Sequence, residues 1–151
     1  MTIRVQTEDF DLTTEVENLT RGRIDIGAIV TFTGVVRAGN DDGQINTMQL
    51  EHYPGMTEIE LERVEAEALG RWPLQCTLII HRYGSLSPGD NIVLVIAASA
   101  HRQAAFEAAS FLMDYLKTRA PFWKKESNSD GDGEWVSARA SDCVASKRWT
   151  K

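Results

Sequence analysis

Runs of hydrophobic residues divide this 151-residue chain into strands and helices. The β-branched run IGAIVTFTGVVR at 26–37 is followed by the glycine-rich AGNDDG and then by a second strand-like run, INTMQLEHY, at 45–53. β-branched runs bounded by glycine-rich turns are typical of strands. We therefore expect these two strands to pair as a hairpin with a mobile tip.

The segment PGMTEIELERVEAEALG at 54–70 predicts a helix. Thr57 and Glu60 have the spacing of a capping box at its start. Gly70 is a natural C-terminal stop. One face is expected to be buried through three residues at helical spacing: Leu61, Val64 and Ala68.

Two nearly continuous hydrophobic runs, CTLIIHRY at 76–83 and NIVLVIAA at 91–98, predict strands that are buried on both faces. A second helix is expected over about 100–120, because Pro121 disfavours helical geometry in the residue before it. EWVSAR, at 134–139, reads as a short late strand. The buried stripe of the second helix is expected to contain Ala104, Ala108, Phe111, Leu112 and Tyr115. Together these elements predict an α+β fold, with a mostly antiparallel sheet and two main helices.

Length and composition indicate a single domain over residues 1–151. The chain has 42% hydrophobic and 25% charged residues, as globular proteins do, and its net charge of −6 argues against a nucleic-acid-binding protein. No signal peptide and no membrane span is recognisable, so we expect a cytoplasmic protein. Cys76 and Cys143 fit a reducing compartment, where packing is their default role.

The stretch LKTRAPFWKKE at 116–126 concentrates positive charge around a proline and two aromatic residues. Lys117 and Arg119 fall in the last turn of the second helix, where cations complement the helix dipole without any further function. That explanation does not extend to Lys124 and Lys125, which follow the proline. Neighbouring aromatic residues can exclude water and lower the pKa of a lysine, which makes its amine usable in catalysis.

Three more basic positions are candidates for anion binding. His101 and Arg102 fall in the first turn of the second helix, where free N–H groups favour an anion, although a solvated first turn is an equal alternative. Arg37 closes a strand, and an exposed strand-end arginine is the simpler interpretation of it. His52 and His81 are most simply core or edge residues. No group of residues has metal-ligand spacing, so we predict neither a metal site nor a cofactor.

Five blocks taken together resemble the large, catalytic subunit of molybdopterin synthase: VTFTGVVR, LEHYPGM, HRYGSLSPGD, SAHRQAAFEA and MDYLKTRAPFWKKE. The resemblance runs in register from about Gly27 to Trp149. It implies an α/β-hammerhead fold and a transferase, a sulfurtransferase of molybdenum cofactor biosynthesis. The expected donor is the C-terminal Gly-Gly thiocarboxylate of a small ubiquitin-like subunit, and the expected acceptor is cyclic pyranopterin monophosphate. The resemblance also implies a homodimer that carries a small subunit at each end, a heterotetramer.

The resemblance implies roles for individual residues as well. Lys117 and Lys124 are expected to lie closest to catalysis, and Lys117 could act as a nucleophile or as a proton donor. Where the family often has an arginine, this chain has Lys125, which would bind less specifically. The full set expected to hold the substrate is Val35, Val36, Arg37, His101, Arg102, Lys117, Lys124, Lys125, Glu126 and Arg139.

Two other functions remain open at this point. A lysine enzyme could form a Schiff base on a carbonyl substrate, with either Lys117 or Lys124, and would need no protein partner. A non-catalytic scaffold could bind an acidic protein tail through the basic residues, and it would not bind a phosphorylated pterin.

Overall fold

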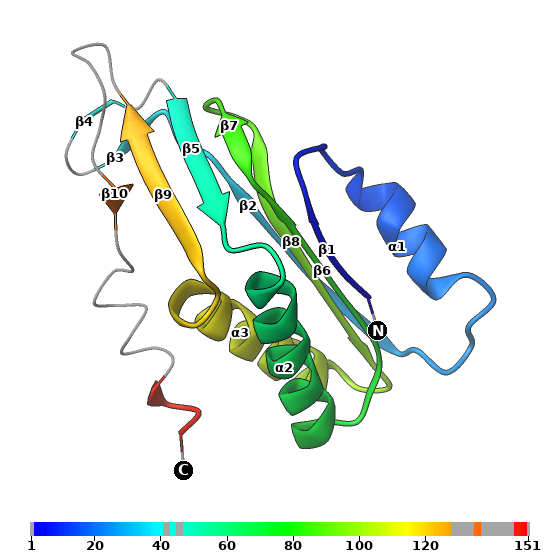
Figure 1. Cartoon of the computed structure of the whole chain (residues 1–151). Coiled ribbons are helices and arrows are strands. Elements are labelled where there is room, and N and C mark those ends of the chain that lie inside the picture. Colours follow the sequence, from blue (N-terminus) through cyan, green and yellow to red (C-terminus); the bar gives the residue numbers. More distant parts are fainter. Residues whose placement is uncertain (1, 41–42, 45–46, 128–134, 137–146, 151) are drawn as a thin grey trace.

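Two four-stranded sheets, one two-stranded ribbon and three helices form an α+β fold in the part of the chain that the structure describes (Figure 1). The computed structural model describes residues 2–40, 43–44, 47–127, 135–136 and 147–150. The first sheet has the order β1-β6-β8-β2, with β1 parallel to β6 and the other neighbours antiparallel. Its strands are β1 (Thr2–Gln6), β6 (Leu74–Arg82), β8 (Asn91–Ser99) and β2 (Ala28–Val35).

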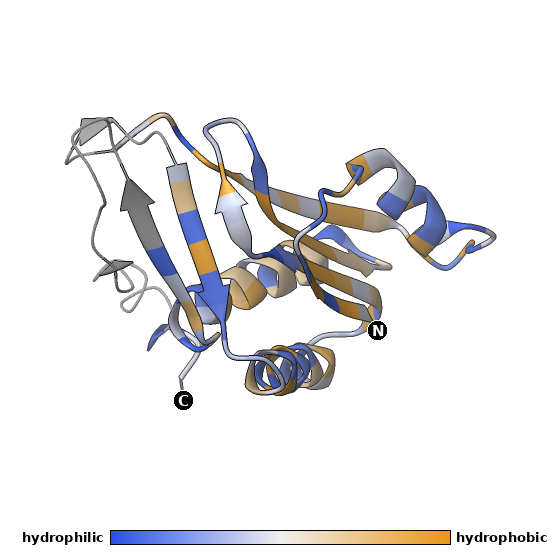
Figure 2. Cartoon of the chain, turned by 45° about the horizontal axis from the view of Figure 1, so that its top comes forward, coloured by the Kyte–Doolittle hydropathy of each residue, from blue (hydrophilic) through white to orange (hydrophobic). Residues whose placement is uncertain are grey.

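The second sheet has the order β10-β9-β5-β7 and is antiparallel throughout. In the orientation of Figure 2, β5 alternates hydrophobic and hydrophilic residues along its length, as a strand with one buried face should. The ribbon pairs β3 (Gly39–Asn40) with β4 (Gly43–Gln44). The strands of the second sheet are β10 (Trp135–Val136), β9 (Phe122–Ser127), β5 (Thr47–His52) and β7 (Gly84–Leu86).

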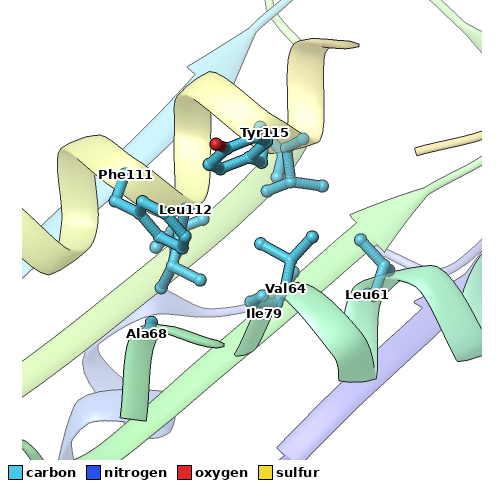
Figure 3. Packing of buried hydrophobic residues seen from close by; sticks show 10 residues of the cluster. Leu61, Val64, Ala68, Ile79, Phe111, Leu112 and Tyr115 are labelled. Carbon is cyan, nitrogen blue, oxygen red and sulfur yellow. The ribbon is translucent and has the colours of Figure 1, made fainter. Parts of the chain in front are cut away.

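The helices cover both faces of the first sheet. Helices α2 (Met56–Arg71) and α3 (Arg102–Thr118) pack on one face, and α1 (Leu12–Thr20) packs on the other (Figure 1). Alternation along β6 produces this division, because Ile79 faces α2 and α3 while its neighbours Leu78 and Ile80 face α1. Figure 3 shows the first of these cores, in which the labelled side chains are Leu61, Val64, Ala68, Ile79, Phe111, Leu112 and Tyr115.

The structure confirms the fold class and the main elements predicted from hydrophobicity. The runs at 76–83 and 91–98 form β6 and β8, which pair with each other and are buried on both faces over their central residues. The second helix is continuous, as expected. Its predicted stripe is buried at Ala108, Phe111, Leu112 and Tyr115, whereas Ala104 is only half-buried and its neighbour Ala105 takes the buried position.

The hairpin predicted between 26–37 and 45–53 is wrong. β2 pairs with β8 over its whole length, and β5 pairs with β7 and β9 in the other sheet. The physical reason is burial: β8 offers β2 a long hydrophobic partner. After β2 the chain crosses to a separate small core, formed by Val36, Met48, Leu50 and Leu86.

The predicted capping box between Thr57 and Glu60 is also wrong, because α2 starts earlier. Gly55 is the N-cap residue, with a φ of 87° that favours glycine, and its N–H donates to the Glu58 carboxylate at 2.7 Å. Gly70 lies inside the last turn, and the helix ends one residue later. No helix in the described part of the chain is long and hydrophobic enough to cross a membrane.

Candidate functional site

A pocket of about 310 Å³ opens where the end of β2 meets the last turn of α3. Two cationic side chains, Arg37 and Lys117, lie at this pocket together with the His81 imidazole, and most of the remaining wall is hydrophobic. The combination of a hydrophobic wall and a few polar groups is typical of small-molecule sites. The lining residues are Phe32, Thr33, Gly34, Val35, Arg37, His81, Ile92, Val93, Met113, Leu116 and Lys117.

An irregularity at the end of β2 aims its last residues at the pocket. The register against β8 shifts between Gly34 and Val35, as in a β-bulge. Glycine is needed there, because a Cβ atom on Gly34 would lie 2.8 Å from Cγ1 of Val93. Beyond the shift, Val35 is 45% exposed and Arg37 is exposed, and both reach the pocket.

Val36, between these two residues, does not line the pocket. Its side chain is buried in the small core, its N–H donates to the Asp90 carbonyl at 2.9 Å, and its carbonyl accepts from the Gly89 N–H at 2.8 Å. The Val36 side chain therefore faces the small core and not the pocket, and the predicted place of Val36 in the substrate site stays a prediction. Val36 instead anchors the backbone that carries Val35 and Arg37.

Helix α3 brings Lys117 to the pocket from its last turn. Leu116 and Met113 line the wall beside it, and Leu116 also belongs to the core between α2, α3 and the sheet. The backbone at Lys117 is therefore fixed by the packing of its neighbour Leu116, while the lysine residue is exposed. A cation in the last turn also complements the helix dipole.

Strand β9 places Lys124 on the same face as Phe122, because side chains alternate along a strand. Phe122 stacks on His81, with ring centroids 3.6 Å apart and an interplanar angle of 15°, so this face of β9 adjoins the pocket. Lys124 is half-buried and lies opposite Leu50 of β5. Lys125 and Glu126 continue the strand, but their side chains lie outside the described part of the structure, as does all of Arg139.

His81 is a pocket residue that sequence reasoning misses, since its pattern indicates only a core or edge position. Its pKa is lowered to about 4, chiefly by burial; the backbone hydrogen bond to Arg82 opposes this, and the positive charges of Lys117 and His52 add to it. The residue as a whole is half-buried and is one of those that line the pocket. No local pattern marks His81, because its stacking partner Phe122 belongs to a different sheet.

His101 and Arg102 lie at the opposite end of α3 and do not line the pocket. His101 is the N-cap residue, and both side chains are exposed. Sixteen residues at 1.5 Å per residue separate His101 from Lys117 by about 24 Å along the helix axis. Within one chain, these residues therefore cannot contact the same small molecule as Lys117.

Neither a metal site nor a reactive cysteine is found in the described part of the chain. No group of three histidine, cysteine, aspartate or glutamate side chains there could hold a metal ion. Cys76 is buried, and burial raises the pKa of its thiol, which disfavours the reactive thiolate. Cys143 lies outside the described residues.

Comparison with known proteins shows clear similarity over the whole chain. The family described as MoaE protein matches residues 5–119. A relative from Mesorhizobium japonicum, named molybdopterin synthase catalytic subunit, is 58% identical over 149 residues, which cover 98% of this chain and 92% of the relative. The solved structure of the molybdopterin biosynthesis MoaE protein from Burkholderia ambifaria is 51% identical, with a TM-score of 0.83 over 99% of this chain and 98% of that one.

A more distant structure shares the fold. It is a protein–protein complex of subunits 1 and 2 of the molybdopterin-converting factor from Helicobacter pylori. The matching chain is 18% identical, with a TM-score of 0.72 over 91% of this chain and 90% of that one. At this level of identity the likeness concerns the fold alone.

Proposed function

The chain belongs to the MoaE protein family, and from this premise we propose that it acts as the catalytic subunit of a molybdopterin synthase. It transfers sulfur from the C-terminal thiocarboxylate of a small ubiquitin-like subunit to cyclic pyranopterin monophosphate, which gains the dithiolene of molybdopterin. The observation that carries this proposal is the pocket that joins Arg37 and Lys117, in a chain of this family.

The chemistry of the pocket suits this substrate. Arg37 and Lys117 supply positive charge for the phosphate and for the anionic thiocarboxylate. Phe32, Val35 and Met113 provide a hydrophobic wall for a flat ring system. The chain as a whole has a net charge of −6, so these cations run against its overall charge and favour an anionic ligand.

Lys117 has two possible roles in the reaction. As a free amine it attacks the acyl carbon of the thiocarboxylate: a C–N bond forms, the C–S bond breaks, and the sulfur leaves as hydrosulfide, with the proton that the amine gives up, to attack the substrate. Water must then hydrolyse the amide to release the small subunit and free Lys117 for the next turnover. As an ammonium ion it instead gives a proton to the substrate oxygen that the sulfur replaces. Lys124, on the face of β9 that adjoins the pocket, supplies a third cation, after Arg37 and Lys117, for the anionic groups.

We further propose that the complete site needs two copies of the chain, so that His101 and Arg102 of one copy serve the pocket of the other. The apolar edge of the first sheet supports this proposal. β2 is the edge strand, and its side chains Ile29, Phe32 and Val35 are 41%, 42% and 45% exposed. A second copy covering this edge would exclude water from the pocket. With two small subunits the assembly is a heterotetramer, and we expect it to act in the cytoplasm.

Reconstitution tests the proposed function directly. The purified chain is incubated with a thiocarboxylated small subunit and cyclic pyranopterin monophosphate, and dithiolene product is measured. Product is expected with the thiocarboxylate, and none with the same subunit bearing an ordinary C-terminal carboxylate or lacking its last two residues. A Schiff-base enzyme would be indifferent to the small subunit, and a scaffold would not bind the pterin, so either result would refute the proposal.

A further inference from the structure

The His81 imidazole lies at the pocket, and the proposed function so far gives it no role. It stands near the end of β6, whereas Lys117 comes from α3 and Arg37 follows β2. The tertiary structure therefore brings a histidine from a third element to two cations. A histidine in such a place either adds to the positive charge or serves as a neutral polar group.

Two contacts fix the orientation of the ring. One face stacks on Phe122, with centroids 3.6 Å apart, and Nδ1 lies 2.8 Å from the main-chain carbonyl oxygen of Arg82. That carbonyl belongs to the last residue of β6, whose backbone pairs with Gln6 of β1. The stack and the hydrogen bond leave the imidazole little freedom to turn.

The same hydrogen bond selects the tautomer. A carbonyl oxygen only accepts, so Nδ1 of His81 must carry the hydrogen. In a neutral imidazole the other nitrogen, Nε2, is then an acceptor. The charged groups that act on the ring are Lys117 from α3 and His52 from β5. Arg37, after β2, lines the same pocket, and Lys124 lies on the same face of β9 as Phe122.

The ring stays neutral at physiological pH. Burial lowers the pKa of His81 to about 4, and the charges of Lys117 and His52 act in the same direction. A neutral acceptor suits this pocket better than a carboxylate would. It can accept from a cation without repelling the phosphate and thiocarboxylate that the pocket must admit.

We propose that His81 is a positioning residue of the sulfur-transfer reaction, whose unprotonated Nε2 accepts a hydrogen bond from the Lys117 ammonium group and holds that group at the pocket. The proposal rests on the function inferred above. A lysine side chain has many rotamers, and restricting them before substrate arrives lowers the cost of reaching a reactive geometry. His81 acts through Lys117 and transfers no proton itself.

The first test needs no turnover. Long-range ¹H–¹⁵N NMR of the full-length chain should show the Nδ1–H tautomer of His81 at pH 7 and a titration midpoint near 4. Lys117→Met keeps the length of the side chain and removes its charge, so the midpoint should rise. An Nε2–H tautomer, or a midpoint that Lys117→Met leaves unchanged, would overturn the proposal.

The second test uses two variants, each of which keeps the hydrogen-bonding role of one of the two ring nitrogens of His81. The amide oxygen of His81→Gln lies near the position of Nε2, while the amide nitrogen of His81→Asn can still donate to the Arg82 carbonyl. With wild-type chain as reference, His81→Gln should keep kcat within about threefold. His81→Asn should lose at least about tenfold in kcat, with little change in pterin affinity. His52→Asn, at a histidine that also adjoins Phe122 but does not line the pocket, is the matched control and should keep full turnover.

Other outcomes are equally decisive. If His81→Asn is active and His81→Gln is inactive, the role of His81 is structural and the proposal fails. If both variants are active, neither ring nitrogen is needed, and the proposal fails as well. If both variants fail to fold, the NMR result on the wild-type chain decides. If the wild-type chain forms no molybdopterin, the proposed function fails, while the tautomer and the response to Lys117→Met still show whether His81 faces Lys117.

Discussion

At the scale of single residues, two lysines come to the site from different elements. Lys117 stands in the last turn of α3, and Lys124 stands in β9 beyond the proline that separates the two elements. The contribution of Lys117 to helix stability through the dipole is below about 1 kcal/mol. Its loss should therefore separate activity from stability.

Lys117→Ala is expected to reduce turnover by roughly 10²- to 10⁴-fold while the free energy of unfolding changes by less than about 1 kcal/mol. Lys124→Ala should also be severely impaired. Reconstituted turnover and urea unfolding measure the two effects. Lys147→Ala, at an exposed lysine near the C-terminus, is the control and should keep its activity. Turnover near the wild-type rate in both site variants would remove the lysines from the mechanism.

His81 gives the protein a specific dependence of stability on pH. Its pKa is about 4 in the folded chain and about 6.5 when unfolded, so between these values the unfolded state binds more protons. Stability is therefore lost as the pH falls through this window, by about 1–3 kcal/mol. Urea unfolding measures the loss of free energy of unfolding between pH 7 and pH 4.5. This loss should be larger in the wild type than in His81→Phe, by about 1–3 kcal/mol. An equal difference in both proteins would contradict the assignment.

At the scale of elements, two glycines should respond in opposite ways to alanine. Gly27 precedes β2, and a Cβ atom there would lie 2.1 Å from the Ala100 carbonyl oxygen, which is backbone and cannot rotate away. Gly70 lies in the last turn of α2, where a Cβ atom would meet nothing within 4 Å and φ is not positive. The first glycine is needed for the close approach of the chain to β8, and the second is not.

Gly27→Ala is therefore expected to lower the free energy of unfolding by at least about 2 kcal/mol, since a backbone overlap has to be relieved by moving a strand. Gly70→Ala should raise it by up to about 1 kcal/mol, because alanine is the better helix former. Urea unfolding of both variants beside the wild type measures the two changes. Equal effects of the two substitutions would mean that the approach of β2 to residue 100 does not constrain the fold.

At the scale of the whole molecule, the length of α3 has a consequence for assembly. The helix is continuous from Arg102 to Thr118, so His101 and Lys117 are about 24 Å apart along its axis. If both contact one pterin, they must come from different copies of the chain. An isologous dimer would then hold two equivalent shared sites.

Subunit complementation tests the shared site. Inactive Lys117→Ala chains are mixed in equal amounts with inactive His101→Ala chains, and the copies are allowed to exchange. Half of the dimers are then mixed, and each of these has one site with both lesions and one with neither, so about a quarter of wild-type turnover is expected. The unmixed variants, treated in the same way, are the controls. No recovery despite proven exchange would refute the shared site, because His101 of one copy would then not serve the pocket of the other.

Hydrophobic pattern alone is enough to predict the elements that form the centre of the fold. β6 and β8 come from long hydrophobic runs, and α2 and α3 each have a long hydrophobic stripe. Such segments must be buried, whichever element they pack against. The elements that are not predicted are β1, α1, β3, β4, β7 and β9. Helix α1 has only nine residues and none of them is buried, so it leaves a weak pattern in the sequence. The basic residues Arg37, Lys117 and Lys124 are also recognisable, chiefly through the family resemblance; charge alone singles out only the lysines that follow the proline.

Only the tertiary structure decides how these pieces meet. Local periodicity states which face of a strand is buried but not which distant strand lies beside it, so the pairing of β2 with β8 cannot be read from the chain. For the same reason the sequence cannot show that Val36 turns into a core between its two pocket neighbours, or that His81 and Phe122, 41 residues apart, stack beside Lys117. The sequence alone shows that residue 81 is a histidine. That it is a neutral acceptor depends on its burial, and the elements that bury it meet only in the folded chain.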